Sequence, residues 1–327
     1  MRPLAQTQIR RVGKIIGSDL PVSDVVRPEG VPSKITTGVE SRLIPEGAEV
    51  VLPGGYQATL VTRSNDRAGS QGIYLVKQNS AAYIYKVYGN RCNPIRQWSN
   101  RLGALLEGRS KPDAETRLRI ERQTLALWRQ HGFPVFREAP SAPHIEFDAP
   151  YLRMEYVPGA SATQYFADPA VERKAKFETL GRLIMEWGKR HELARSLHEP
   201  SLVHEHPSLG HLWRGEDGIF YTFDFEVVFT RAYRTDHLIA REIFRLTRSV
   251  ITTVPAEERG DYLDFILKHY PFPEFFKIAY TTLCASPNPF VRAFRFLERH
   301  APRNRRPFSR FQVARWIHER LCRLQRI

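Results

Sequence analysis

The change of hydrophobic period along the chain is the feature that most constrains its fold. Strand-like segments lie between residues 58 and 89, and in the last of them, residues 81–89, side chains alternate between two faces. Residues 174–197 instead carry an apolar stripe at the spacing of one long amphipathic helix. A front of antiparallel strands followed by a mostly helical back predicts an α+β protein with two lobes.

The same patterns predict three regions. Residues 1–55 form an irregular lead-in rich in Pro, Gly and Ser, residues 56–158 the lobe with the sheet, and residues 159–327 the helical lobe with an arginine-rich extension. The first 17 residues of the lead-in are basic and partly amphipathic. They could form a short helix on an anionic membrane, although a small helix packed on its own domain is the preferred interpretation.

Charge limits the kind of partner. The 327 residues carry a net charge of +14, which points to phosphate-rich partners such as nucleic acid, an anionic membrane surface or a phosphorylated glycolipid. The three cysteines are far apart and show no metal-binding or disulfide spacing, which suits a reducing, cytoplasmic compartment. No apolar run approaches the roughly 18 residues of a membrane-spanning helix.

A helix is predicted over residues 113–132, between the strands. Asp113 can cap its first turn, and Gly132 can end it with a positive φ. Glu121 lies beside the apolar stripe that should face the sheet. That stripe consists of Leu118, Leu125 and Trp128.

Residues 202–229 contain a histidine loop, a turn and a strand that ends in Asp-Phe. The loop reads His-Glu-His-Pro-Ser-Leu-Gly-His from His204 to His211, and Asp224 follows thirteen residues later. With Lys86 in a strand and Glu121 in a helix upstream, these motifs occur in the order found in kinases. The chain thus resembles the protein-kinase-like superfamily, and within it the bacterial lipopolysaccharide kinase (Kdo/heptose kinase) type, over about residues 56–250.

The resemblance implies an ATP site with Mg²⁺ or Mn²⁺. Lys86 would hold the nucleotide phosphates, and Glu121, or alternatively Glu115, would hold Lys86. Glu155 and Val157 lie in the segment that would bind adenine through its main chain. A loop over residues 64–72 takes the place of a glycine-rich phosphate cover, although it contains few glycines.

Two substitutions separate the loop from the kinase pattern. His206 stands where the catalytic Asp belongs, and His211 where a metal-binding Asn belongs. A neutral imidazole can accept a proton, but Mg²⁺ prefers oxygen ligands, so His211 is a poor replacement while Asp224 could still hold one metal ion. His204 would have a structural role in the catalytic loop. A softer metal held by these three histidines and Asp224 is a further alternative.

The sequence therefore leaves several interpretations open. The first is a nucleotide-binding pseudokinase or impaired kinase, and the second an active, atypical sugar or lipopolysaccharide kinase that uses His206 as base. A phosphorylated glycolipid or the inner-membrane surface would be the further partner, through a peripheral contact. A nucleic-acid-binding protein is the least favoured, because it leaves Lys86, Glu121 and Asp224 unexplained. Arg241 and Glu242 are expected to form a local ion pair, and oligomeric state is not predicted.

Overall fold

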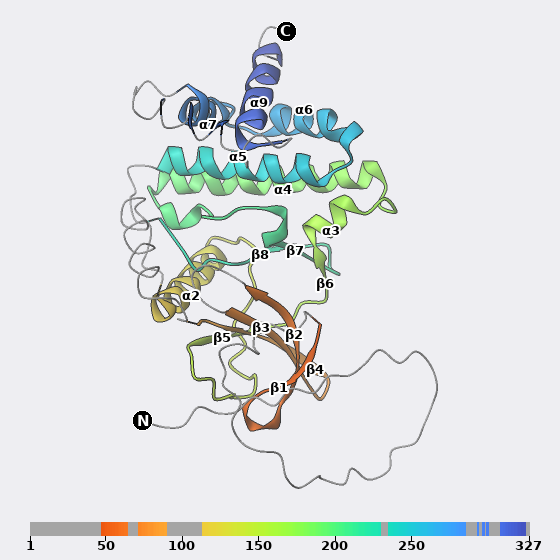
Figure 1. Cartoon of the computed structure of the whole chain (residues 1–327), viewed down its shortest axis with the longest axis vertical. Helices are drawn as coiled ribbons and strands as arrows, with labels where there is room; N and C mark the ends of the chain where they lie inside the picture. Colours follow the sequence, from red (N-terminus) through yellow and green to blue (C-terminus); the bar gives the residue numbers. More distant parts are fainter. Residues whose placement is uncertain are drawn as a thin grey trace. The chain divides into compact units, whose positions relative to one another are not determined.

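The computed structural model shows a mixed protein with an antiparallel sheet and many helices (Figure 1). The residues it describes are 47–64, 71–89, 113–229, 235–285, 293, 296–297, 299–300 and 308–324. The predicted helix within residues 1–17 and most of the predicted loop over residues 64–72 lie outside this part. The coarse prediction of antiparallel strands followed by helices is confirmed.

The chain divides into two compact units. The first consists of residues 1–92 and 138–156, and the second of residues 93–137 and 157–327. The break near residue 156 lies close to the boundary predicted at 158. The helix predicted over residues 113–132 belongs to the second unit, however, although the sequence grouped it with the strands.

The first unit is built on a five-stranded antiparallel sheet. In spatial order its strands are β1 (Glu49–Val51), β2 (Gln57–Ser64), β3 (Gln71–Gln78), β4 (Ala81–Val87) and β5 (Tyr151–Glu155). Asn79 has a φ of 55° in the tight turn between β3 and β4, a conformation that Asn tolerates better than most residues. One face of the sheet packs on the segment that precedes β5, where the hydroxyl of Tyr85 donates a 2.5 Å hydrogen bond to Pro143 O.

The second unit contains the helices and a small sheet. The helices are α2 (Ala114–Gln130), α3 (Ala162–Ala167), α4 (Arg173–Ser196), α5 (Thr235–Thr253), α6 (Arg259–His269), α7 (Glu274–Cys284) and α9 (Arg310–Leu324). The sheet consists of β6 (Gly159–Ser161), β7 (Leu212–Gly215) and β8 (Phe220–Thr222). Of the helices in the described ranges, none is both long and apolar enough to cross a membrane.

Helix α2 begins and ends as its sequence predicts. The Asp113 side chain accepts a hydrogen bond from Thr116 N at 2.9 Å, and Gly132 has a φ of 79° after the last turn. The predicted apolar stripe is only partly correct. Leu125 and Trp128 are buried, but Leu118 is half-buried, and the buried face includes the charged side chain of Glu121.

Helices α4 and α5 run side by side through the second unit (Figure 1). The predicted core stripe of α4, formed by Leu180, Ile184 and Trp187, is buried. Helix α4 also buries the charged side chain of Arg190, and α5 that of Glu242. These two helices position the histidine loop.

Candidate functional site

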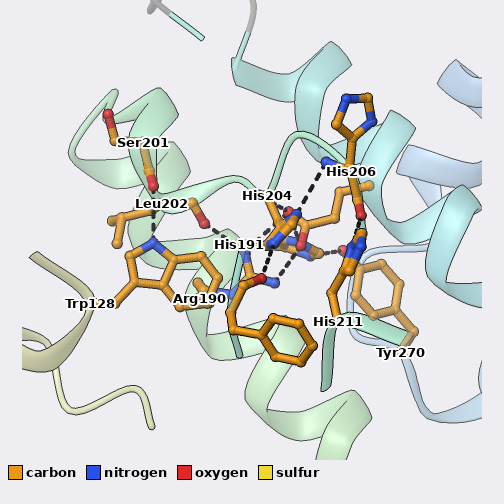
Figure 2. Close-up of polar contacts among 11 residues, drawn as sticks. Trp128, Arg190, His191, Ser201, Leu202, His204, His206, His211 and Tyr270 are labelled. Carbon is orange, nitrogen blue, oxygen red and sulfur yellow. Dashed lines mark hydrogen bonds and ion pairs between the residues drawn. The ribbon is translucent and has the colours of Figure 1, made fainter. Parts of the chain in front are cut away.

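The histidine loop is fixed at its start by a buried carboxylate. Glu242 on α5 accepts a hydrogen bond from His204 N at 3.0 Å and forms a two-pronged ion pair with Arg190 on α4, at 2.6 and 3.0 Å. Arg190 also donates to Leu202 O at 2.5 Å, so the same guanidinium holds the chain just before the loop (Figure 2). The prediction of an ion pair between Arg241 and Glu242 is wrong. Arg241 pairs with Glu205, and Glu242 pairs with Arg190.

A histidine and a tyrosine complete this buried network. His191 Nε2 lies 3.2 Å from Glu242 Oε2, and its Nδ1 lies 2.7 Å from the hydroxyl of Tyr270 (Figure 2). Burial alone would raise the pKa of Glu242, but Arg190 and His191 hold this pKa well below its usual range. Burial lowers the pKa of His191. The carboxylate is therefore ionised and serves as the anchor of the loop.

His204 connects the loop to the strand that precedes Asp224. Its Nε2 donates to Phe223 O at 2.9 Å, and its Nδ1 accepts from His206 N at 3.1 Å. Burial lowers the pKa of His204 to about 4, so the ring is neutral at pH 7. Because both ring nitrogens bond the main chain, His204 holds the loop in shape and has no nitrogen left for a metal ion.

His206 lies at the surface, between a carboxylate and a guanidinium. Its Nε2 contacts the carboxylate of Glu205, and its Nδ1 lies 3.4 Å from Arg245 Nη1. The side chain of His206 is 54% exposed, whereas that of Glu205 is 2% exposed. Arg241 Nη2 donates to Glu205 Oε1 at 3.1 Å, and Arg245 Nη1 donates to Glu205 O at 2.6 Å. Figure 2 shows the His206 ring pointing away from the buried histidines.

His211 and Asp224 lie next to each other at the other end of the loop. His211 Nδ1 donates to His206 O, and its Nε2 lies 3.7 Å from Asp224 Oδ2. The His211 ring stacks on His204 with 5.5 Å between centroids. Asp224 has a φ of 73°, a strained region for a residue other than Gly. Both side chains are part-exposed, so this carboxylate could reach a ligand.

A metal site is only partly provided by these residues. The described part of the chain contains no group of three or more His, Cys, Asp or Glu side chains able to hold a metal ion. The alternative site for a softer metal ion, made of three histidines and Asp224, is therefore not formed. His204 bonds main-chain groups, and His206 contacts Glu205. One carboxylate, Asp224, still fits a Mg²⁺ ion whose other ligands are nucleotide phosphates and water.

The segment after Asp224 is packed against α2. The Phe225 ring lies 4.6 Å from Trp128, centroid to centroid, and Glu226 accepts a hydrogen bond from Arg117 Nη1 at 3.0 Å. The Trp128 indole in turn donates to Ser201 O at 2.9 Å. This segment is thus held by both a ring contact and an ion pair.

The remaining predicted residues are divided between the two units. In the first, Lys86 is 3% exposed, pairs with Ile73 and Leu152 on neighbouring strands, and has Nζ 5.5 Å from the ring centroid of Tyr88. Glu155, at the exposed end of β5, belongs to the same unit.

The second unit holds Glu121 and Val157. Glu121 is buried on α2, whereas the alternative, Glu115, is exposed. Val157 O accepts a 2.9 Å hydrogen bond from the Trp213 indole, so this carbonyl already bonds within the protein.

Sequence reasoning missed Arg190, His191, Arg245 and Tyr270, which surround the loop, and it paired Arg241 and Glu242 with each other. A signal was present for the buried role of Glu242, since it interrupts a run of residues that are buried on α5. A charge within an apolar stripe indicates a buried ion pair.

Comparison with known proteins adds no assignment. No protein-family model matches the chain, and no curated protein matches it.

Proposed function

We propose that the chain is a kinase-like, nucleotide-binding protein whose phosphotransfer loop is inactive or severely impaired. The observation that carries the proposal is the setting of His206, whose ring nitrogens face the Glu205 carboxylate and the Arg245 guanidinium. This residue takes the place of the catalytic Asp in the resemblance.

A general base needs a lone pair within hydrogen-bond reach of the proton it removes. The contact with Glu205 favours a proton on Nε2 of His206, which leaves Nδ1 as the acceptor. That nitrogen lies 3.4 Å from Arg245 Nη1, so the guanidinium competes with a substrate hydroxyl for its lone pair. Loss of a general base typically costs about 10²–10⁴-fold in rate, so the loop as arranged is a poor catalyst.

Lys86 supports retained nucleotide binding. It lies on β4, between β3 and β5, so it is not the solubilising lysine of an edge strand. In a kinase-like protein a buried strand lysine holds nucleotide phosphates, the role proposed for Lys86.

Asp224 supports the same proposal from the second unit. The positive φ of Asp224 strains the backbone, as is often found at functional sites, and Asp tolerates this conformation better than most residues. Its part-exposed carboxylate could hold a metal ion that nucleotide phosphates also bind. The metal would offset phosphate charge, while Asp224 would fix its position.

The test is calorimetric titration of the full chain with ATP, with and without Mg²⁺ and Mn²⁺. We expect metal-dependent binding that is lost in both Lys86→Ala and Asp224→Ala. Lys77→Ala is the matched control, because Lys77 is exposed on β3 and should not affect binding. Absence of binding at millimolar ATP would reject the proposal.

An active kinase is the second candidate, and one observation favours it. The Glu205 carboxylate orients an exposed His206, an arrangement that activates histidine in other enzymes. If the wild-type protein transfers phosphate from ATP and His206→Ala abolishes transfer, this candidate replaces the inactive one. We expect no turnover above the rate of the His206→Ala variant.

A further inference from the structure

Two large apolar side chains are exposed next to each other in helical residues between α7 and α9. Phe296 is 60% exposed and Leu297 is 69% exposed. No large apolar side chain in the described ranges is more exposed than Leu297. Single exposed apolar residues are common on protein surfaces, whereas neighbouring ones mark a surface that binds a partner or a membrane.

Helical spacing places these two side chains on one face with two further residues. Ala293 precedes them by three and four positions, and His300 follows them by four and three, which are the separations of neighbours on a helix surface. All four residues are helical and exposed. The His300 ring packs on the Phe296 ring, with 4.2 Å between centroids. This exposed face, Ala293, Phe296, Leu297 and His300, is therefore largely apolar.

Arginines surround the exposed face in the sequence. Residues 291–310 contain seven arginines and one acidic residue, Glu298. One of these arginines, Arg299, is itself helical and exposed, three positions after Phe296. A local excess of positive charge of this size attracts anionic partners. The segment thus combines exposed apolar side chains with a strongly basic sequence.

We propose that the exposed face is a docking surface for an anionic phospholipid bilayer, into which Phe296 and Leu297 insert at the level of the headgroups. Helices that lie on a bilayer combine apolar side chains on one face with Arg or Lys beside them. An anionic bilayer supplies negative charge for the arginines and an apolar layer for the two side chains. The phosphate backbone of a nucleic acid supplies only the charge. A second copy of this basic chain supplies an apolar face but repels the arginines.

Co-sedimentation of the full chain with phosphatidylglycerol vesicles tests the surface. At about 0.1 M NaCl, where exposed charges still act over ~10 Å, we expect saturable binding by the wild type. The double variant Phe296→Ser/Leu297→Ser should bind at least about tenfold more weakly, because two apolar side chains no longer enter the bilayer. Arg299→Gln should bind about fivefold more weakly, the effect of one basic residue near an anionic surface.

Two further variants separate insertion from a loss of structure. Phe296→Trp keeps a large ring of the kind favoured at membrane interfaces, so it should bind at least as tightly as the wild type. Ile219→Ser is the matched control for an exposed apolar side chain. Ile219 is 44% exposed in the turn between β7 and β8, where Glu216 and Asp217 are also exposed. An anionic bilayer repels such a turn, so vesicle binding should be unchanged, and circular dichroism checks the fold of each variant.

The proposal is overturned if Phe296→Ser/Leu297→Ser binds vesicles as tightly as the wild type, since charge alone would then explain binding. It is also overturned if Ile219→Ser weakens binding as much as the double variant does. Analytical ultracentrifugation tests the alternative occupant, a second copy of the chain. If the double variant converts a dimer into a monomer, the exposed face joins two copies and the bilayer proposal is rejected.

This docking surface is independent of nucleotide binding. Lys86 is buried in the first unit, whereas the exposed face belongs to the second. Lys86→Ala should therefore lose ATP binding and keep vesicle binding, and Phe296→Ser/Leu297→Ser should show the reverse. If Lys86→Ala weakens vesicle binding as much as the double variant does, the assignment of docking to Phe296 and Leu297 is overturned.

Discussion

At the scale of single residues, His204 and Glu242 act together to hold the loop. Glu242 accepts from the main chain of His204, while the His204 ring bonds Phe223 O and His206 N. A buried polar group is costly unless its hydrogen bonds are satisfied. The neutral state of His204 is therefore part of the folded structure, and its protonation should oppose folding.

Protonation gives a stability change with pH. The pKa of His204 falls from 6.5 to about 4 on burial, so below pH 6.5 the unfolded chain binds a proton that the folded chain refuses. The free energy of unfolding should therefore fall as pH is lowered from 6.5 to about 4, by up to about 1.4 kcal/mol per pH unit. His191, whose pKa burial also lowers, should add to this loss.

Urea unfolding across this pH range measures the effect. His204→Gln keeps a side chain that can donate to Phe223 O but cannot titrate, so its stability should depend less on pH than that of the wild type. His198→Gln serves as a control, because His198 is exposed after α4. An equal pH dependence in wild type and His204→Gln would contradict the assignment.

The residues that a short motif contains could be identified from sequence, but their partners could not. His204, Gly210 and Asp224 could be identified because the number of residues between them can be counted along the sequence. Arg245 lies about forty residues from His206 along the chain, and only the packing of α5 brings the two together. The sequence alone therefore suggested His206 as a base, whereas the structure shows its ring nitrogens facing Glu205 and Arg245.

At the scale of elements, the segment after Asp224 depends on α2. Arg117 donates to Glu226, and Trp128 packs on Phe225. The Arg117 side chain is 3% exposed, so loss of its carboxylate partner would leave a buried charge less compensated. Glu226→Gly should consequently loosen the segment, by removing this ion pair and adding backbone freedom.

Hydrogen exchange measures that loosening. In Glu226→Gly, the amides of residues 223–229 should exchange at least about tenfold faster, which corresponds to about 1.4 kcal/mol of local opening. Glu216→Gly, an exposed change in the turn between β7 and β8, should leave them unaffected. Unchanged exchange of residues 223–229 in Glu226→Gly would show that Phe225 alone fixes the segment.

Most helices and strands could be predicted because the hydrophobic period and the turn or cap residues of each segment indicate the same element. The strands around β2, β3 and β4 follow alternation and turn residues, and α2 follows its Asp113 cap and Gly132. The strand predicted to end in Asp-Phe is present as β8, which stops at Thr222, but β6 and β7 were not predicted, since they have only three or four residues. Such strands are too short to display a period.

At the scale of the whole molecule, grouping by sequence order failed for α2. Chain order joins it to the strands, but its contacts through Trp128 and Arg117 are with Ser201 and Glu226 of the second unit. Long-range side-chain contacts of this kind leave no periodic signal. A boundary drawn from composition therefore lies close to the break near residue 156, but it groups α2 with the strands and not with the second unit.

The net charge of +14 leads to a prediction for the complete chain. A surplus of basic residues is attracted to anionic bilayers by about 1 kcal/mol for each Lys or Arg near the surface. We expect the protein to sediment with phosphatidylglycerol vesicles at low salt. Between about 0.1 and about 1 M NaCl the screening length falls from ~10 to ~3 Å, and binding should be lost.

Uncharged phosphatidylcholine vesicles are the control and should not bind at any salt concentration. A double-stranded oligonucleotide at the same charge concentration distinguishes membrane from nucleic acid as the preferred polyanion. We expect it to displace the protein from vesicles no more than its charge alone explains. Complete displacement, with a steep dependence of affinity on salt, would instead favour the nucleic-acid interpretation.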